Sequence, residues 1–152
     1  MAGITSALCT SFKVELLEGD HDFNNGADAF KVALFKANAS ITGTYSAATT
    51  NYSDVTGNSD ELPNGSGYTT GGYALTNVNP TSTGTTAFTD FSANAAWSSA
   101  TFTTRGCIIY NTSDGNSAVA VINFGADYSV SGGTFEIQWP TADSSNAIIR
   151  IA

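Results

Sequence analysis

The stretch that decides the fold is TFTTRGCIIYNTSDGNSAVAVINFG, residues 101–125. It contains two apolar-rich runs, residues 101–111 and 117–125, separated by the polar residues 112–116. Short apolar runs on either side of a loop rich in Asn, Asp, Gly and Ser predict a β-hairpin. Residues 118–122 are apolar at successive positions, so both faces of this strand would be buried. We therefore predict that this hairpin provides a central strand of the fold.

Further strands are predicted outward from this hairpin. In residues 133–139, apolar Phe135, Ile137 and Trp139 alternate with polar residues, which indicates one solvated face and an antiparallel sheet. Gly132 and Gly133 predict a tight connection over residues 127–133. The regular spacing of the strands is typical of all-β proteins. We predict an all-β fold, a single-domain antiparallel β-sandwich of the jelly-roll or Ig-like type with long polar loops. The other strands expected after residue 71 are residues 72–78, 85–91 and 147–151.

The first half of the chain carries weaker patterns. Residues 12–17 and 29–36 both alternate apolar and polar side chains, and each range predicts a strand. The polar residues 19–26 between them predict a long loop, so the two strands are expected to pair as an early antiparallel hairpin. Residues 38–71 are dominated by Thr, Ser, Asn and Gly, and we interpret them as surface loops with one short strand.

Four residues are candidates for contacts with a partner. Residues 1–11 are predicted to form an N-terminal arm ahead of the β-sandwich domain, residues 12–152. Ile4 and Leu8 give this arm an apolar character, and such a segment either frays or packs on a surface, for which a neighbouring subunit is one hypothesis. Trp97 lies just before a long strand and is a candidate for surface contact. Arg105 lies within that strand, where a cross-strand ion pair or an intersubunit contact is expected.

Composition limits the partners. Thirteen acidic residues against five Lys and Arg give a net charge of −8, so the chain lacks the cations that nucleic-acid binding requires. An anionic membrane surface is an unsuitable partner for the same reason. No stretch approaches the roughly 20 apolar residues of a transmembrane helix, and the first residues lack the basic start of a signal peptide. We expect neither nucleic acid nor membrane as a partner.

Catalytic chemistry is sparse in this sequence. The single histidine, His21, lies between two aspartates in a predicted loop and is interpreted as an exposed loop residue. A zinc site needs three or four ligands, and no second histidine is present. An EF-hand starting at Asp20 would place Asn25 at its glycine position and Lys31 at its glutamate position, so that pattern fails. The two cysteines are interpreted as small packing residues, although a disulfide stays open. We expect no catalytic, metal or cofactor site and no enzymatic activity.

Several motifs carry a resemblance to a known group of proteins. They resemble small structural proteins of tailed bacteriophages, over somewhat more than the second half of the chain, and residues 30–36 resemble that group's early strand. The resemblance implies a virion component with an all-β body, of the head cement or decoration type, and it implies no catalytic residues. The motifs are GSGYTTGG (65–72), AFTDF (87–91), WSSATFTTRGCIIYN (97–111), AVAVINFG (118–125) and GGTFEIQWP (132–140).

From this resemblance we expect a capsid cement protein that binds and stabilises the lattice of the major capsid protein. The expected partners are that protein and copies of this chain, in a homo-oligomer such as a trimer. The chain would be made in the host cytoplasm and located on the phage head surface. Two alternatives stay open. The first is a tail or surface-fibre module whose loops and Trp97 bind host glycans, and the second is a hydrolase built on two of the scattered carboxylates.

Overall fold

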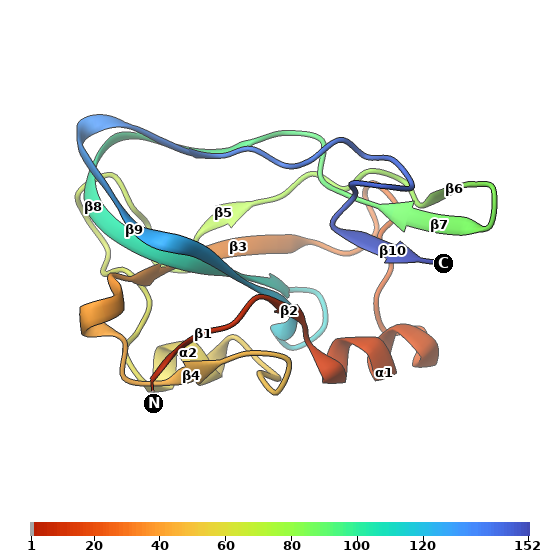
Figure 1. The fold of residues 1–152 in the computed structure, drawn as a ribbon, viewed down its shortest axis with the longest axis horizontal. Helices are drawn as coiled ribbons and strands as arrows, with labels where there is room; N and C mark the ends of the chain where they lie inside the picture. Colours follow the sequence, from red (N-terminus) through yellow and green to blue (C-terminus); the bar gives the residue numbers. More distant parts are fainter. Residues whose placement is uncertain (1) are drawn as a thin grey trace.

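The hairpin predicted from residues 101–125 is the longest element of the computed structural model, which describes residues 2–152 (Figure 1). Strand β8 (Ala95–Asn111) runs antiparallel to β9 (Ser117–Ile137), and residues 112–116 form the turn. The predicted hairpin is therefore confirmed, but both strands are longer than expected. The connection predicted over residues 127–133 is wrong, because these residues continue β9. Gly125 and Gly132 have φ values of 83° and 64°, which let the strand bend without breaking.

The central sheet has five strands in the order β2-β9-β8-β3-β5. Strand β3 (Phe30–Lys36) is antiparallel to β8, with Leu34 opposite Cys107, and β2 (Ala7–Leu8) and β5 (Tyr73–Ala74) are short edge strands. Residues 118–121 are all buried, and β9 lies inside the sheet between β2 and β8. The prediction of a central strand here is confirmed.

The β8–β9 hairpin is sharply curved and passes from one layer of the molecule to another (Figure 1). Its half near the turn belongs to the five-stranded sheet, whereas its far half turns back over β5, where Tyr73 contacts Trp97. The register shifts between Thr104 and Gly106. A Cβ atom on Gly106 would lie 2.3 Å from the carbonyl oxygen of Ile122, so a larger residue cannot occupy this point of the bend.

Two smaller sheets complete the fold. Strands β10 (Ile149–Ile151), β7 (Thr86–Thr89) and β6 (Thr81–Thr83) form an antiparallel sheet in that order. Strands β1 (Gly3–Ile4) and β4 (Thr44–Tyr45) form a parallel pair. The structure is thus mostly β with predominantly antiparallel pairing, as the sequence predicts.

The main departure from the sequence prediction is helix α1 (Thr10–Glu18), which occupies the place of the strand predicted over residues 12–17. Phe12 and Leu16 are one helical turn apart and pack against the core, so a helix buries them as well as a strand would. Gly19 ends the helix with φ 90°, and its N–H donates to the Glu15 carbonyl. The early hairpin with residues 29–36 is therefore wrong. The remaining helices are the short α2 (Ser53–Gly57) and the 3-10 turn η1 (Asn38–Ser40).

Residues 3–8 of the predicted N-terminal arm pack on the chain's own body. Strand β1 pairs with β4, β2 pairs with β9, and the Asn123 side chain donates to the Ile4 carbonyl at 2.7 Å. Ile4 is buried in the core rather than presented to another subunit.

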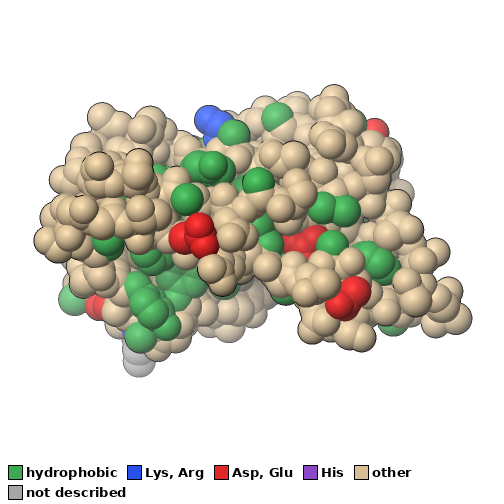
Figure 2. All heavy atoms as spheres, turned by 90° about the horizontal axis from the view of Figure 1, so that it is seen from above, with side chains coloured by type: hydrophobic (Ala, Val, Ile, Leu, Met, Phe, Trp, Pro, Cys, Tyr) green, Lys and Arg blue, Asp and Glu red, His purple; other side chains and the backbone are tan. Residues whose placement is uncertain are grey.

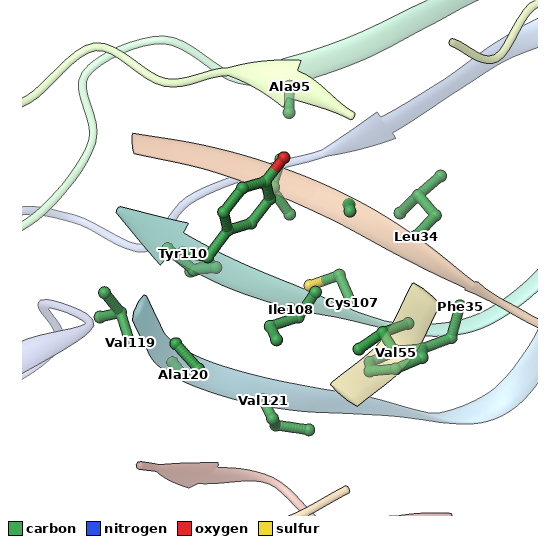
Figure 3. Packing of buried hydrophobic residues seen from close by; sticks show 14 of the residues in the cluster. Leu34, Phe35, Val55, Ala95, Cys107, Ile108, Tyr110, Val119, Ala120 and Val121 are labelled. Carbon is green, nitrogen blue, oxygen red and sulfur yellow. The ribbon is translucent and has the colours of Figure 1, made fainter. Parts of the chain in front are cut away.

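The core lies on both faces of the central sheet (Figure 3). Strand β3 has four consecutive buried residues, Val32 to Phe35, so neither face of the sheet meets solvent there. Cys9 and Cys107 are both buried and free, which agrees with their interpretation as packing residues. Among residues 2–152, no helix has the length and apolarity to cross a bilayer.

Candidate functional site

Large apolar side chains are exposed where α1 meets β10. Val14 and Leu17 on the outer side of α1 are 51% and 89% exposed, and Ile151 at the end of β10 is 58% exposed. Between the two elements runs a groove of about 280 Å³. Its apolar lining is Leu8, Phe12, Leu16, Leu17, Ile149 and Ile151. We call the three exposed residues and this groove the α1–β10 surface.

The backbone adds to this surface. Strand β10 is the last strand of its sheet, so one of its edges has no neighbouring strand within residues 2–152. An exposed edge can pair with another chain through main-chain hydrogen bonds. Leu17 and Ile151 line one groove beside this edge, and exposed apolar side chains gathered in this way are a feature of interaction sites.

The α1–β10 surface also concentrates positive charge. Lys13 and Arg150 line the groove, in a chain with five Lys and Arg in all. The face seen in Figure 2 is mainly backbone and uncharged polar side chains, with hydrophobic and acidic side chains at several places and a basic side chain at its edge. The groove is therefore apolar with a basic rim on an otherwise acidic protein.

The predicted contact residues occupy different environments. Leu8 is partly buried and lines the groove of the α1–β10 surface. Arg105 lies on β8 with its Nη1 atom 3.9 Å from Asp127 Oδ1 on β9, which agrees with the expected cross-strand ion pair. Sequence reasoning missed Val14, Leu17 and Ile151. The adjacent pair Leu16-Leu17, which breaks strict alternation, is the signal that favours a helix with an apolar outer side.

Trp97 is not a surface residue. It is only 6% exposed, and its ring centroid lies 5.6 Å from that of Tyr73 and 5.9 Å from that of Phe135. The expectation of a surface contact is wrong because the far half of the β8–β9 hairpin turns its inner side chains toward the sheet. The half-exposed aromatic residue is instead Tyr128, which lines a hollow of about 270 Å³ with Phe124 and Phe135.

His21 is buried, so its interpretation as an exposed loop residue is wrong. Its Nε2 atom lies 2.9 Å from Glu15 Oε2, and its Nδ1 atom lies 3.0 Å from Asn111 Nδ2. The amide of Asn111 also donates to Asp28 at 2.8 Å. Because that amide nitrogen is a donor, Nδ1 accepts and the imidazole proton resides on Nε2. Asp114 completes a group in which one ligand atom from each of Glu15, His21 and Asp114 lies within 4.8 Å of the others.

The buried carboxylates elsewhere are held by hydrogen bonds. Glu61 accepts from the hydroxyls of Tyr52 and Tyr68 and from the Gly71 N–H. Burial, followed by this hydrogen bond and charge from Glu61, raises the pKa of the Tyr52 hydroxyl, so the tyrosine stays a neutral donor. Satisfied carboxylates of this kind stabilise the loops that they join.

Asp60 and Asp90 show opposite pKa shifts. Burial disfavours the charged form of Asp60, but hydrogen bonds from Tyr45, Gly43 and Thr42 outweigh it and lower the pKa. For Asp90, burial outweighs the N–H groups of Phe91 and Ile148 and raises the pKa.

Comparison with known proteins adds no assignment. A scan of the chain against protein-family models gives no match, and searches of curated proteins and of solved structures give none.

Proposed function

We propose that this chain is a non-enzymatic structural protein of a tailed-phage virion, a cement or decoration protein on the head surface. In this proposal it binds the lattice of the major capsid protein and copies of itself, in a homo-oligomer such as a trimer, after synthesis in the host cytoplasm. The sequence resemblance motivates the proposal. The α1–β10 surface is the observation that carries it, because it offers an apolar contact area without reactive groups.

The energetics of such a protein suit this surface. Burying a Leu, Val or Ile side chain is worth about 1.5–3 kcal/mol, so Val14, Leu17 and Ile151 supply a modest affinity at each contact. A lattice repeats the contact, and an oligomer that engages several positions gains avidity without new contacts. The basic rim of Lys13 and Arg150 favours an acidic border on the capsid protein.

The assignment of the fold to a β-sandwich of the jelly-roll or Ig-like type is part of the same proposal. The curvature that places the far half of the β8–β9 hairpin over β5 supports a sandwich of the jelly-roll or Ig-like type. Two sheets packed face to face interdigitate their inner side chains into one core, and a rigid body of this kind suits a protein that binds a repeating lattice.

Deleting the gene from the phage that encodes it tests the proposal. Particles should assemble, lose integrity at a lower temperature or under osmotic shock, and recover when purified protein is added. Imaging of intact particles should locate the chain on the head. The proposal would be contradicted if intact particles never contain the chain, or if particles made without the gene are as stable as natural ones.

In the glycan-binding alternative, Trp97 cannot contact a sugar, because it is buried. The exposed Tyr128 beside Phe124 and Phe135 offers a different aromatic surface for stacking. A glycan array decides between the two candidates. Saturable sugar binding that is abolished by Tyr128→Ala would favour the recognition module, and an array without binding would favour the cement protein.

A further inference from the structure

We propose that two copies of the free chain associate through the outer side of α1, with the two helices parallel and related by a two-fold axis. The proposal deepens the self-association in the proposed function and rests on that part of it. Capsid binding through the α1–β10 surface would use the same apolar side chains, so it would compete with this dimer. The order of apolar and charged side chains along α1 carries the inference.

The solvent-exposed side of α1 has a regular pattern. Thr10, Val14 and Leu17 are exposed and are spaced by four and three positions, so they form one stripe along the helix. Lys13 and Glu18 are also exposed, and at 3.6 residues per turn they lie on opposite sides of this stripe. Val14 and Leu17 are two of the large hydrophobic residues that are exposed within residues 2–152. We call the stripe and its two flanking charges the α1 seam.

The α1 seam has the residue order of a two-stranded coiled coil. Such a coil repeats apolar residues at spacings of three and four, and a β-branched residue followed by Leu at these two positions favours two parallel strands. Val14 and Leu17 occupy these positions, and Thr10 is the preceding seam residue. The helix is short, but it does not need the second copy to form, since Phe12 and Leu16 hold its inner side against the core.

The flanking charges determine the orientation of the two helices. In a parallel pair, Lys13 of each copy faces the residue five positions further along the other helix, which is Glu18. The two-fold axis generates this pair twice, as in symmetric dimers generally. An antiparallel pair would instead place Lys13 beside Lys13 and Glu18 beside Glu18, where like charges repel. Within residues 2–152, neither side chain forms an ion pair, so both are available to the second copy.

The surroundings of the α1 seam indicate a weak dimer. The groove beside α1 is lined by Lys13 and Arg150, so the carboxylate of the second copy approaches a basic rim. Leu17 and Ile151 line the same groove and extend the apolar contact. One helix of nine residues nevertheless gives a small interface, typical of transient association. Each copy also carries a net charge of −8, and the resulting repulsion opposes association.

Sedimentation equilibrium of the purified chain, without capsids, tests the proposal. We expect a reversible monomer–dimer equilibrium with a Kd on the order of 100 µM. Lys13→Glu and Glu18→Lys should each dimerise at least about fivefold more weakly, because each substitution turns both attractive pairs into repulsive ones. An equimolar mixture of these two variants should recover the affinity of the natural chain, since opposite charges then face each other in both pairs. This recovery also shows that both variants are folded.

Glu136→Lys is the matched control, because it makes the same change of charge at an exposed position on β9, outside the α1 seam. It should dimerise at least as tightly as the natural chain. The proposal would be overturned by a natural chain that stays monomeric at about ten times the expected Kd. It would also be overturned if Lys13→Glu dimerises as the natural chain does, or if the mixture gains nothing over either variant alone.

The dimer and the cement function fail in different measurements. A natural chain that is monomeric in solution and still saturates capsids would refute the dimer alone. A chain that dimerises as described and binds no capsid would refute the cement function alone.

Discussion

Trp97 and Tyr73 pack edge to face, with ring centroids 5.6 Å apart and ring planes at 65°. The two residues come from different layers, because Trp97 is on the far half of the β8–β9 hairpin and Tyr73 is on β5 at the edge of the central sheet. The rings of Tyr68 and Phe135 surround the same indole. This aromatic cluster therefore fastens the curved hairpin over the sheet.

Replacing Trp97 with Ala should destabilise the chain strongly. The change removes a buried indole at the junction of two layers and leaves a cavity, at a cost of about 3–5 kcal/mol. Urea unfolding followed by circular dichroism measures this cost. Tyr128→Ala is the matched control, since its ring is half-exposed, and it should cost less than about 1 kcal/mol. Equal losses for the two variants would mean that Trp97 is not part of the core.

Asp60→Asn should show a stability cost that depends on pH. At pH 7 the change weakens hydrogen bonds from Tyr45, Gly43 and Thr42, and we expect a loss of about 2–4 kcal/mol. The folded pKa of Asp60 lies below its ordinary value of 3.8, so its contribution is complete above that value and fades as the pH falls through the folded pKa. The difference in free energy of unfolding between the natural chain and Asp60→Asn, measured by urea unfolding from pH 7 to pH 3, should therefore become smaller as the pH falls. A gap of constant size would contradict this explanation.

Asp90→Asn should show the opposite pH dependence, because ionisation of Asp90 opposes folding whereas ionisation of Asp60 favours it. Burial raises the pKa of Asp90, so the folded state holds its proton more tightly than the unfolded state. Ionisation of Asp90 above its folded pKa therefore opposes folding, and this penalty disappears as the pH falls below the unfolded value. At pH 7, Asp90→Asn should lower the free energy of unfolding by less than Asp60→Asn does, measured in the same urea-unfolding assay. A greater loss for Asp90→Asn than for Asp60→Asn at pH 7 would show that its hydrogen bonds dominate.

Gly72→Ala should destabilise the chain far more than Gly84→Ala. Both glycines have positive φ, 80° and 60°, so both substitutions incur backbone strain of about 1 kcal/mol. A Cβ atom on Gly72 would also lie 1.9 Å from the carbonyl oxygen of Val32, whereas nothing lies within 4 Å of the corresponding position on Gly84. We expect a difference of at least about 2 kcal/mol in thermal or urea unfolding. Equal effects would mean that β5 does not approach β3 this closely.

The cysteines should be inert in the folded chain. Burial, with smaller contributions from Glu15 and Asp54, raises the pKa of Cys9 to about 11, and burial raises the pKa of Cys107 further. The thiolate is the reactive form, so at pH 8 neither residue should react with Ellman's reagent until the chain unfolds. In denaturant both of the two cysteines should react. Rapid labelling of the folded chain would show that one of them reaches solvent.

Local patterns predicted the elements whose structure depends on near neighbours. The hairpin around residues 112–116 and strand β3 both follow from alternation and turn residues. Helix α1 was missed because Phe12, Val14 and Leu16 satisfy the strand period, while Phe12 and Leu16 also satisfy the helix period. Gly19 is the local signal that favours the helix, since a glycine in left-handed conformation is a common helix end.

The rest depends on contacts that are distant in sequence. His21 is buried because Asn111 and Phe30 lie against it, and its surroundings cannot be read from residues 19–26. Trp97 is buried because the hairpin curves, and that curvature comes from register shifts and from glycines within the strands. The α1–β10 surface likewise requires the folded chain, since Leu17 and Ile151 lie near opposite ends of the sequence.

Binding of purified protein to capsids that lack it tests most directly the claim that the chain acts through the α1–β10 surface. Leu17→Asp places a charge at the most exposed large apolar side chain of residues 2–152, whereas Tyr128→Asp places one in a separate hollow that shares no lining residue with the α1–β10 groove. We expect the natural chain and Tyr128→Asp to saturate the capsids with similar affinity, and Leu17→Asp to bind at least about tenfold more weakly at each contact. Full binding by Leu17→Asp, or loss of binding by Tyr128→Asp alone, would contradict the claim.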